Sequence, residues 1–153
     1  ASVYLETSFF SECCTIRQTD VARGRRATSL HWWEHKLDTS TSASFISAEV
    51  VRELSSEDFP LAVREPALKM LSGLALLIIT DEVLALADTL VRERVMPSPA
   101  VEGDAVHVAV ALVHRMDHLV TWNQTHLANQ NKRVHLQVVC SRPGYTLPEI
   151  VTP

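Results

Sequence analysis

Several features that would set a chain apart from ordinary globular proteins are lacking in this sequence. Only four of its 153 residues are glycine and 21% are charged, a composition that argues against disorder. Three cysteines, two of them adjacent at Cys13 and Cys14, do not make a disulfide framework and indicate free thiols in a reducing cytoplasm. The longest apolar run, residues 74–79, is far too short to cross a bilayer, and no charged and then apolar leader precedes Val3. We therefore expect a cytoplasmic protein with no membrane segment.

A strong excess of charge of one sign is lacking too. The 14 basic and 18 acidic residues give a net charge of −4, which is not typical of a general nucleic-acid binder. The basic residues are nevertheless unevenly distributed, because Arg17, Arg23, Arg25 and Arg26 follow one another closely around the start of a predicted helix. Such a run is most often a solvated helix face. The alternative is that these four arginines contact the phosphates of RNA.

The apolar content, 46%, is enough for one core, and a single domain over residues 1–153 is expected because no repeat or low-complexity segment is present. Strands are predicted over residues 2–5, 45–46, 75–79, 118–122 and 149–152, and helices over 7–13, 20–37, 47–54, 61–71 and 80–90, with a further helix that carries Asp104. This alternation predicts an α/β protein in which helices cover a central parallel sheet, a three-layer α/β/α sandwich.

Three segments carry more specific signals. Residues 75–79 lack any polar alternation and are predicted to form a fully buried parallel strand. Ser98 and Pro99 are the residue types of an N-cap and a first helical position, so they predict where the helix of Asp104 begins. Residues 132–142 alternate like a strand but also fit a helix, and the sequence pattern alone does not decide between the two.

The predicted helix over residues 20–37 contains two adjacent tryptophans, Trp32 and Trp33. Neighbouring residues cannot share one face of a helix. One ring is therefore expected in the core, and the other on a partner surface or in a second contact. A polar loop rich in Ser and Thr is predicted to follow over residues 39–44.

The region most informative about function is residues 103–129, GDAVHVAVALVHRMDHLVTWNQTHLAN. It begins as a helix of small and apolar residues, which suits close packing on a sheet, and continues as a short strand rich in β-branched and aromatic residues. Asp104 lies at the start of the helix and Asn123 lies just past the strand. In α/β proteins these two places can meet at the carboxyl edge of the sheet, where ligands usually bind.

These residues resemble the C-terminal signature of PIN-domain nucleases of the VapC toxin type. Residues 104–111 match D-A-x-H-x-A-x-A, and residues 117–129 match D-x-L-x-T-W-N-x-x-H-x-A-N. Residues 3–8, 47–54 and 148–153 agree with the same family and occur in the expected order. The resemblance implies a PIN-like fold over nearly the whole chain, with the ambiguous C-terminal segment as a helix.

The resemblance also implies an acidic metal site. It assigns metal-binding and catalytic roles to Glu6, Glu53 and Asp104, with Asn123 as a fourth polar ligand. Glu6 is longer than the Asp that the broader superfamily usually has at this place, and Asn123 replaces a carboxylate used by many relatives. Glu49 lies one turn before Glu53 and is interpreted as compensating the helix dipole or as supporting the site.

The chemistry expected of such a site follows from its charges. Three carboxylates held close together repel one another and need a cation. Oxygen ligands, with no cysteine and no histidine at ligand spacing, favour Mg²⁺ or Mn²⁺ over Zn²⁺. Such a metal can activate water to attack a phosphodiester. The resemblance implies that the substrate is RNA, and that the protein is the toxin of a type II toxin–antitoxin pair, usually dimeric and silenced by a small antitoxin.

Two other functions stay open on the sequence. Because Glu6 and Asn123 depart from the usual acids, the chain is alternatively a catalytically weak PIN domain that only binds RNA or a partner. A third interpretation is a metal-dependent phosphohydrolase that acts on small phosphate esters. His107, one turn past Asp104, is interpreted as a residue that hydrogen-bonds across the packing, with a catalytic role as the less frequent alternative. His126 is interpreted as orienting Asn123 or its loop.

Overall fold

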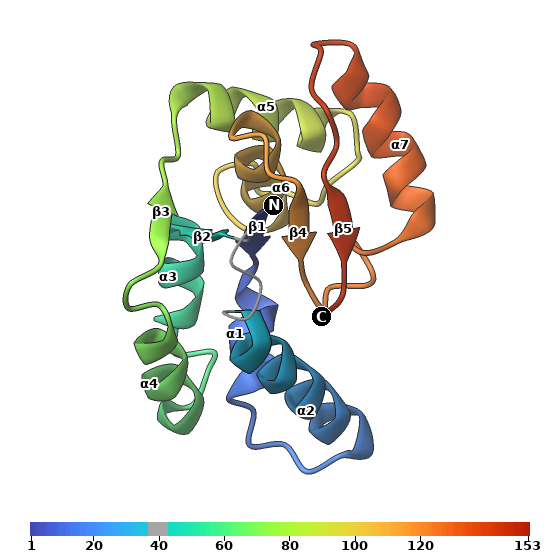
Figure 1. The fold of residues 1–153 in the computed structure, drawn as a ribbon. Helices are drawn as coiled ribbons and strands as arrows, with labels where there is room; N and C mark the ends of the chain where they lie inside the picture. Colours follow the sequence, from blue (N-terminus) through green and yellow to red (C-terminus); the bar gives the residue numbers. More distant parts are fainter. Residues whose placement is uncertain (37–42) are drawn as a thin grey trace.

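A computed structural model describes residues 1–36 and 43–153, and at its centre lies a five-stranded parallel sheet (Figure 1). The strands are β1 (Ser2–Leu5), β2 (Ala43–Ser47), β3 (Ala75–Leu77), β4 (His118–Val120) and β5 (Glu149–Val151). They lie in the order β3-β2-β1-β4-β5, so the first strand of the chain is in the middle. Tyr4 of β1 pairs with Phe45 of β2 on one side and with Leu119 of β4 on the other.

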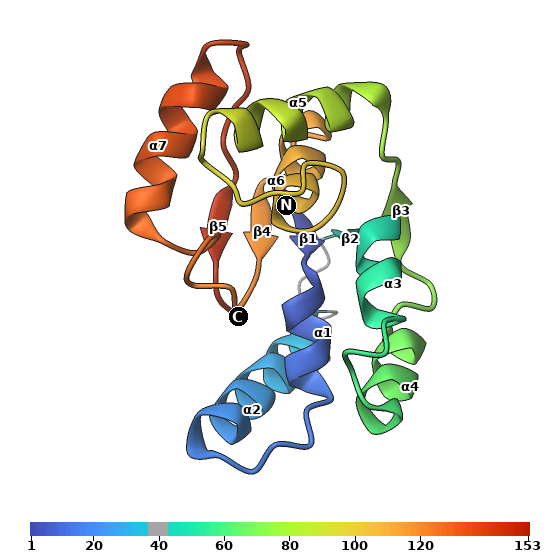
Figure 2. The same cartoon turned by 180° about the vertical axis from the view of Figure 1, so that it is seen from behind.

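Helices lie on both sides of this sheet. In the described ranges they are α1 (Thr7–Cys13), α2 (Asp20–His35), α3 (Ala48–Leu54), α4 (Leu61–Met70), α5 (Asp81–Arg92), α6 (Asp104–Val113) and α7 (Gln130–Ser141). Figure 2 shows α6 in front of the central strands, with α5 above it and α7 beside the edge strand β5, whereas α1 to α4 extend beyond the carboxyl ends of the strands. The predicted three-layer α/β/α sandwich with a central parallel sheet is confirmed. No helix in the described ranges is long and apolar enough to span a membrane.

The centre of the sheet and helix α6 are the most completely buried parts of the domain. Tyr4 and Leu5 of β1 have no exposed surface, and all residues of α6 over 105–112 are buried. Cys13 and Cys140 are free thiols within the same core, as expected from the sequence. Burying one large apolar side chain stabilises a fold by about 1.5–3 kcal/mol. The central strand and α6 are therefore firmly placed, and so are the polar residues at their ends.

Two predictions about particular segments are wrong. The strand predicted over residues 75–79 is shorter and lies at an edge of the sheet, where Leu76 is 58% exposed. An apolar run is fully buried only in an inner strand covered on both faces, and β3 pairs with β2 alone. The helix expected to begin at Pro99 begins at Asp104. Gly103 has a φ of 77°, a left-handed conformation that the interior of a right-handed helix does not accommodate.

Other segments agree more closely with the sequence. The ambiguous segment over 132–142 belongs to helix α7, as the resemblance implied. The helix predicted over 20–37 is α2, with Thr19 as its N-cap. Its predicted last residue, Leu37, lies outside the described residues. So does most of the polar loop predicted over 39–44, the last two residues of which belong to β2.

The two adjacent tryptophans both pack inside the domain. The ring centroids of Trp32 and Trp33 lie 5.3 and 6.0 Å from that of Phe9, and both side chains are half-buried. Phe9 of α1 is completely buried and lies between α2 and the sheet core. Of the two places considered for the second ring, a second contact within the domain agrees with the structure and a partner surface does not, because Phe9 of α1 contacts both rings.

Candidate functional site

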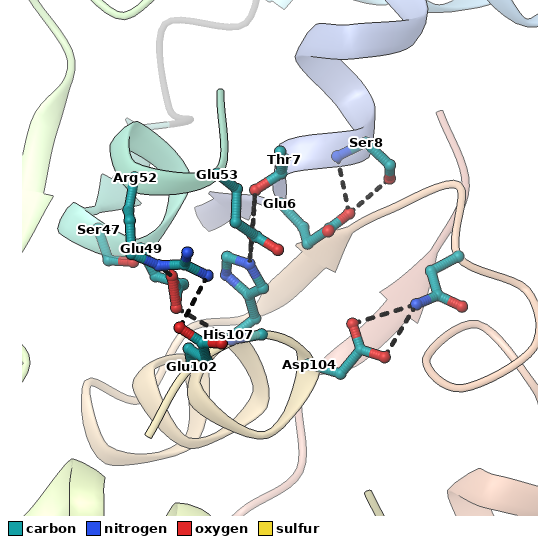
Figure 3. Close-up of polar contacts among 12 residues, drawn as sticks. Glu6, Thr7, Ser8, Ser47, Glu49, Arg52, Glu53, Glu102, Asp104 and His107 are labelled. Carbon is teal, nitrogen blue, oxygen red and sulfur yellow. Dashed lines mark hydrogen bonds and ion pairs between the residues drawn. The ribbon is translucent and has the colours of Figure 1, made fainter. Parts of the chain in front are cut away.

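Polar side chains collect at the carboxyl ends of the three inner strands (Figure 3). β1 ends at Leu5, and the next residue, Glu6, is the N-cap of α1. β2 leads directly into α3, whose second turn carries Glu53. Asn123 lies just after β4 and hydrogen-bonds to Asp104, the first residue of α6. The four residues predicted to form the site therefore lie at one edge of the sheet.

Glu6 is only 5% exposed and uses one carboxylate oxygen to hold the local structure together. Its Oε2 accepts hydrogen bonds from the backbone N–H of Ser8 at 3.0 Å, from the Ser8 hydroxyl, and from the Thr121 hydroxyl at 2.8 Å. The first of these bonds satisfies a free amide at the start of α1. Within the described ranges no donor reaches Oε1. The second oxygen of Glu6 is therefore available to a cation.

Glu53 is held by two donors that approach the same oxygen. The Thr7 hydroxyl donates to Oε1 at 2.6 Å, and Nε2 of His107 contacts the same atom. Burial by itself would raise the pKa of the Glu53 carboxyl. The hydrogen bond and the charge of His107, together with the Thr7 bond, outweigh burial and lower that pKa below its ordinary value.

His107 is completely buried and belongs to a chain of side-chain hydrogen bonds. Its Nδ1 lies 2.7 Å from the Tyr4 hydroxyl, which lies 2.8 Å from the Ser47 hydroxyl at the end of β2. Burial lowers the pKa of His107, but the hydrogen bond to Glu53 and the nearby carboxylates raise it above the ordinary value. Because ionised Glu53 can only accept, Nε2 carries the proton between them. In this arrangement His107 orients the Glu53 carboxylate.

Asp104 and Asn123 form a separate pair. The amide nitrogen of Asn123 lies 3.2 Å from each carboxylate oxygen of Asp104, and the amide oxygen accepts the backbone N–H of His126 at 3.0 Å. The amide nitrogen, which cannot bind a metal, thus faces Asp104, and not the oxygen expected of a ligand. Burial raises the pKa of Asp104 above its ordinary value. The charges of His107 and His126 and the Asn123 hydrogen bond oppose this only in part.

Glu49 links the two helices that carry the acids. It is 4% exposed; its Oε1 pairs with Nε of Arg52, and its Oε2 accepts the backbone N–H of Gly103 at 3.0 Å. Gly103 is the N-cap of α6, so this carboxylate ties α3 directly to the residue before Asp104. Nη2 of Arg52 also lies 3.5 Å from Glu102. Of the two roles considered for Glu49, support of the site agrees with these contacts.

The donor set can be compared with what a metal requires. Ligand atoms of Glu6, Glu53 and His107 lie within 4.8 Å of one another, and Asp104 is outside this group among the described residues. Two carboxylates suit Mg²⁺ or Mn²⁺, whereas imidazole is more typical of transition metals. The expectation that no histidine has ligand spacing is therefore wrong. His107 lies one helical turn past Asp104 but groups with Glu6 and Glu53, which are far away in the chain, so no local spacing signals this group.

A cavity of about 390 Å³ opens beside these residues. Its lining includes Glu6, Glu53, Ser8, Ser11, Ser56 and Arg52. Arg52 has 52% of its side chain exposed, so it places a positive charge at the rim of an otherwise acidic cavity. A hollow with carboxylates inside and a guanidinium at its rim can hold a cation together with a bound anion.

The four arginines predicted to bind RNA differ in their surroundings. Arg25 lies with its Cζ 5.1 Å from the centre of the Trp122 ring. Arg17 forms an ion pair of 2.9 Å with Glu12. The side chains of Arg23 and Arg26 are exposed and make no ion pair or hydrogen bond within the described ranges. Of the four side chains, only that of Arg25 is packed, whereas those of Arg17, Arg23 and Arg26 are exposed.

Comparisons with protein-family models, with curated proteins and with solved structures found no match for this chain. The arrangement of its own side chains must therefore carry the functional argument. That arrangement combines a cluster of largely buried acids with His107, which orients Glu53. Arg52 and Arg25 lie near the cluster and could bind an anion.

Proposed function

We propose that this protein is a Mg²⁺- or Mn²⁺-dependent ribonuclease, with Glu6, Glu53, Asp104 and Asn123 as its site. The observation that carries the proposal is the convergence of the Glu6 and Glu53 carboxylates at the carboxyl edge of a parallel sheet, where their oxygens and a ring nitrogen of His107 lie within 4.8 Å of one another. The motif resemblance supplies RNA as the substrate. It extends the proposal to the toxin of a type II toxin–antitoxin pair, a dimer that acts in the cytoplasm and is silenced by a small antitoxin.

The charges of the site support a cation. Glu6 and Glu49 are almost completely buried, and Glu53 and Asp104 lie beside them. Burying several carboxylates together is costly unless positive charge accompanies them, and His107 and Arg52 supply only part of it. Glu6 and Glu53 would hold the metal, with Asp104 joining from the start of α6.

A bound Mg²⁺ or Mn²⁺ supplies an activated water for attack on a phosphodiester and neutralises charge on the phosphoryl oxygens. The chain's own residues prepare for this chemistry. His107 and Thr7 fix the direction of the Glu53 carboxylate. Ser8 and Thr121 fix Glu6 and leave one of its oxygens open. Arg52, at the rim of the same cavity, is placed to contact the substrate phosphate.

A second candidate is a PIN domain that binds RNA or a partner without cutting. It is favoured by the fact that each acid already has donors from the protein. Asp104 bonds to Asn123 through both oxygens, and Glu53 bonds to His107 and Thr7. An acid satisfied in this way has less need of a metal.

The test is cleavage of a mixed RNA pool by the purified protein with Mg²⁺, with Mn²⁺ and with EDTA, followed by mapping of the cut ends. We expect metal-dependent cleavage that Glu6→Gln reduces by about 10²-fold or more. Gln keeps an oxygen that can cap α1, so the variant should stay folded. Asp88→Asn, on the exposed side of α5, removes the same charge away from the site and should leave cleavage unchanged. RNA binding without cleavage under all three conditions would favour the second candidate.

A further inference from the structure

Trp122 links the two parts of the site that contain Glu6 and Asp104. It follows β4, and its backbone N–H donates to the Ser8 hydroxyl at 2.8 Å, the same hydroxyl that bonds to Glu6. The next residue, Asn123, bonds to Asp104. The backbone of Trp122 is therefore fixed relative to both acids, and so is any group packed on its ring.

Helix α2 is docked against this ring by two residues one turn apart. The indole N–H of Trp122 donates to the hydroxyl of Ser29, which is completely buried, at 2.7 Å. Arg25 precedes Ser29 by four residues and so lies on the same face of the helix. Its guanidinium carbon lies 5.1 Å from the centre of the Trp122 ring, within the range of a cation–π contact.

Two further residues orient the Arg25 guanidinium, and they leave some of its N–H donors without a partner in the described ranges. Nη2 donates to the Gln124 side chain at 3.3 Å, and Nη1 lies 3.9 Å from Oε1 of Glu12. Glu12 is 6% exposed, and its other oxygen is buried with no hydrogen-bond partner in the described part of the chain. A guanidinium has five N–H donors, and Arg25 still has 30% of its side chain exposed. Several of its donors remain free for a ligand.

We propose that Arg25, held by Trp122, Gln124 and Glu12, binds a backbone phosphate of the RNA strand next to the bond that is cut. A planar, oriented guanidinium with free donors matches the geometry of a phosphate. The subsite rests on the proposed ribonuclease function for its place beside the scissile bond. Its phosphate chemistry rests on Arg25 and its neighbours alone. Glu12 acts as a positioning residue, since it is too deeply buried to reach the strand.

The proposal assigns unequal roles to arginines that the sequence treats alike. Arg23 lies two residues before Arg25 on α2, but its side chain is exposed and makes no ion pair or hydrogen bond in the described ranges. A flexible exposed cation loses side-chain freedom when it binds a phosphate, whereas an oriented one has already lost it. Arg23→Ala is thus a matched control for Arg25→Ala, because both remove one charge from the same helix.

The test measures binding of a short single-stranded RNA in EDTA or with Ca²⁺, across a range of salt concentrations. We expect Arg25→Ala to weaken binding by about tenfold or more and to lower the salt slope by about one unit, with Arg23→Ala much closer to the wild type. Arg25→Lys should fall between them, because it keeps the charge but loses the planar fork. Equal losses in Arg25→Ala and Arg23→Ala would overturn the proposal. So would absence of RNA binding by the wild type.

A purely structural role for Arg25 is separated by two further measurements. Thermal unfolding shows whether Arg25→Lys keeps wild-type stability, and with Mn²⁺ a lost phosphate contact raises KM more than it lowers kcat. If Arg25→Ala and Arg25→Lys both bind RNA more weakly only because both are partly unfolded, the proposal is overturned. If the Arg25 and Arg23 variants bind and cut RNA equally well with Mn²⁺, the ribonuclease function stands and the phosphate subsite at Arg25 is excluded. If Arg25→Ala alone loses RNA binding and the wild type does not cut RNA, the phosphate subsite stands and the ribonuclease function is excluded.

Discussion

The two partly buried acids Glu53 and Asp104 shift their pKa in opposite directions because their donors differ in charge. Glu53 faces His107, whose charge and hydrogen bond outweigh burial and lower the carboxyl pKa. Asp104 faces the neutral amide of Asn123, which does not outweigh burial, so the pKa of Asp104 is raised. Without a metal, the negative charge of Asp104 is therefore less well compensated than that of Glu53.

The first prediction concerns Asp104→Asn. We expect a loss of RNA cleavage of about 10²-fold or more, the scale seen when one electrostatic group is removed from an active site. The metal-free variant should be as stable as the wild type or more stable at neutral pH, because the amide removes a buried charge. Cleavage with Mn²⁺ and urea unfolding in EDTA measure the two effects.

The pH dependence of this difference has a definite sign. Below the pKa that Asp104 has in the unfolded chain, the residue is protonated in both states and the ionisation penalty is absent. Between that pKa and the raised pKa of the folded state, the wild type loses stability relative to Asp104→Asn as the pH rises. Above the folded-state pKa the difference is complete. A stability gap that widens on acidification would contradict the assignment, as would wild-type cleavage by the variant.

The sequence predicts which residues reach the site better than how they pair. Glu6 and Asn123 follow inner strands, and the carboxyl ends of parallel strands meet at one edge, so their proximity follows from the pattern. That His107 turns towards Glu53 and away from Asp104 depends on the hydroxyl of Tyr4, far away in the chain. Side-chain direction at a helix end is set by such contacts, and no local pattern contains them.

At the scale of secondary-structure elements, Glu49 controls how α3 meets α6. Its buried carboxylate bonds to Gly103 on one side and to Arg52 on the other. Glu49→Ala removes both contacts, and we expect it to destabilise the domain by about 1–3 kcal/mol, the range for a buried polar partner left without its hydrogen bond. It should also weaken Mn²⁺ binding, because Asp104 follows Gly103 directly. Urea unfolding and calorimetry with Mn²⁺ measure these changes.

Two variants separate the contacts of Glu49. Glu49→Gln keeps an oxygen for Gly103 but loses the charge that holds Arg52, so it should recover part of the metal affinity lost in Glu49→Ala. Glu102→Gln removes only the outer partner of Arg52, at 3.5 Å, and should change stability by less than about 0.5 kcal/mol. If Glu49→Ala binds Mn²⁺ as tightly as the wild type, the link between α3 and α6 does not position the metal site.

The third prediction concerns Trp32 and Trp33 of α2. Because both rings contact Phe9 and both are half-buried, each Trp→Ala variant should destabilise the domain, by about 2–3 kcal/mol, at or below the lower end of the range for a core aromatic residue. Val21→Ala, on the same helix at a position 65% exposed, is the control and should have little effect. A Trp variant with wild-type stability but weaker self-association would instead restore the surface role.

Where the fold departs from the sequence pattern, the reason is position in the sheet or backbone conformation. The apolar run at Leu76 indicates a strand correctly, but its burial depends on strand order, which only the complete topology determines. Ser98 and Pro99 have helix-start chemistry, yet Gly103 turns the backbone into the left-handed region and delays α6 by several residues. The periodicity of residues 132–142 fits both a helix and a strand, so only the family resemblance predicts helix α7.

For the molecule as a whole, the distribution of charge matters more than the net value of −4. Arg52 on α3 lines the acidic cavity, and Arg25 on α2 lies over the ring of Trp122, whose backbone bonds to Ser8 in the same cavity. A field of this kind draws a polyanion to the rims and a cation to the centre, and its strength falls with ionic strength. The net negative charge is therefore compatible with the proposed binding of RNA at this edge.

The last prediction concerns the number of metal ions. The three carboxylates Glu6, Glu53 and Asp104 carry at most three negative charges, and the contact of His107 with Glu53 offsets part of them, so one divalent cation nearly neutralises the site. We expect one Mn²⁺ per chain at full occupancy in the RNA-free protein, and a second only when an RNA phosphate brings further negative charge.

Asn123→Asp tests this count, because it replaces the amide nitrogen that faces Asp104 at 3.2 Å with a second carboxylate. The metal-free variant should unfold at a lower temperature, since two like charges then oppose each other at hydrogen-bonding distance. It should bind Mn²⁺ more tightly and gain more thermal stability from it than the wild type, because a ligand that binds only the folded state adds RT ln(1 + [L]/Kd). Calorimetry and thermal unfolding with and without Mn²⁺ measure both changes, and Asn131→Asp, outside the site on α7, controls for the added charge. Two ions bound at full occupancy by the unmodified, RNA-free chain would show that the site carries more negative charge than these residues supply.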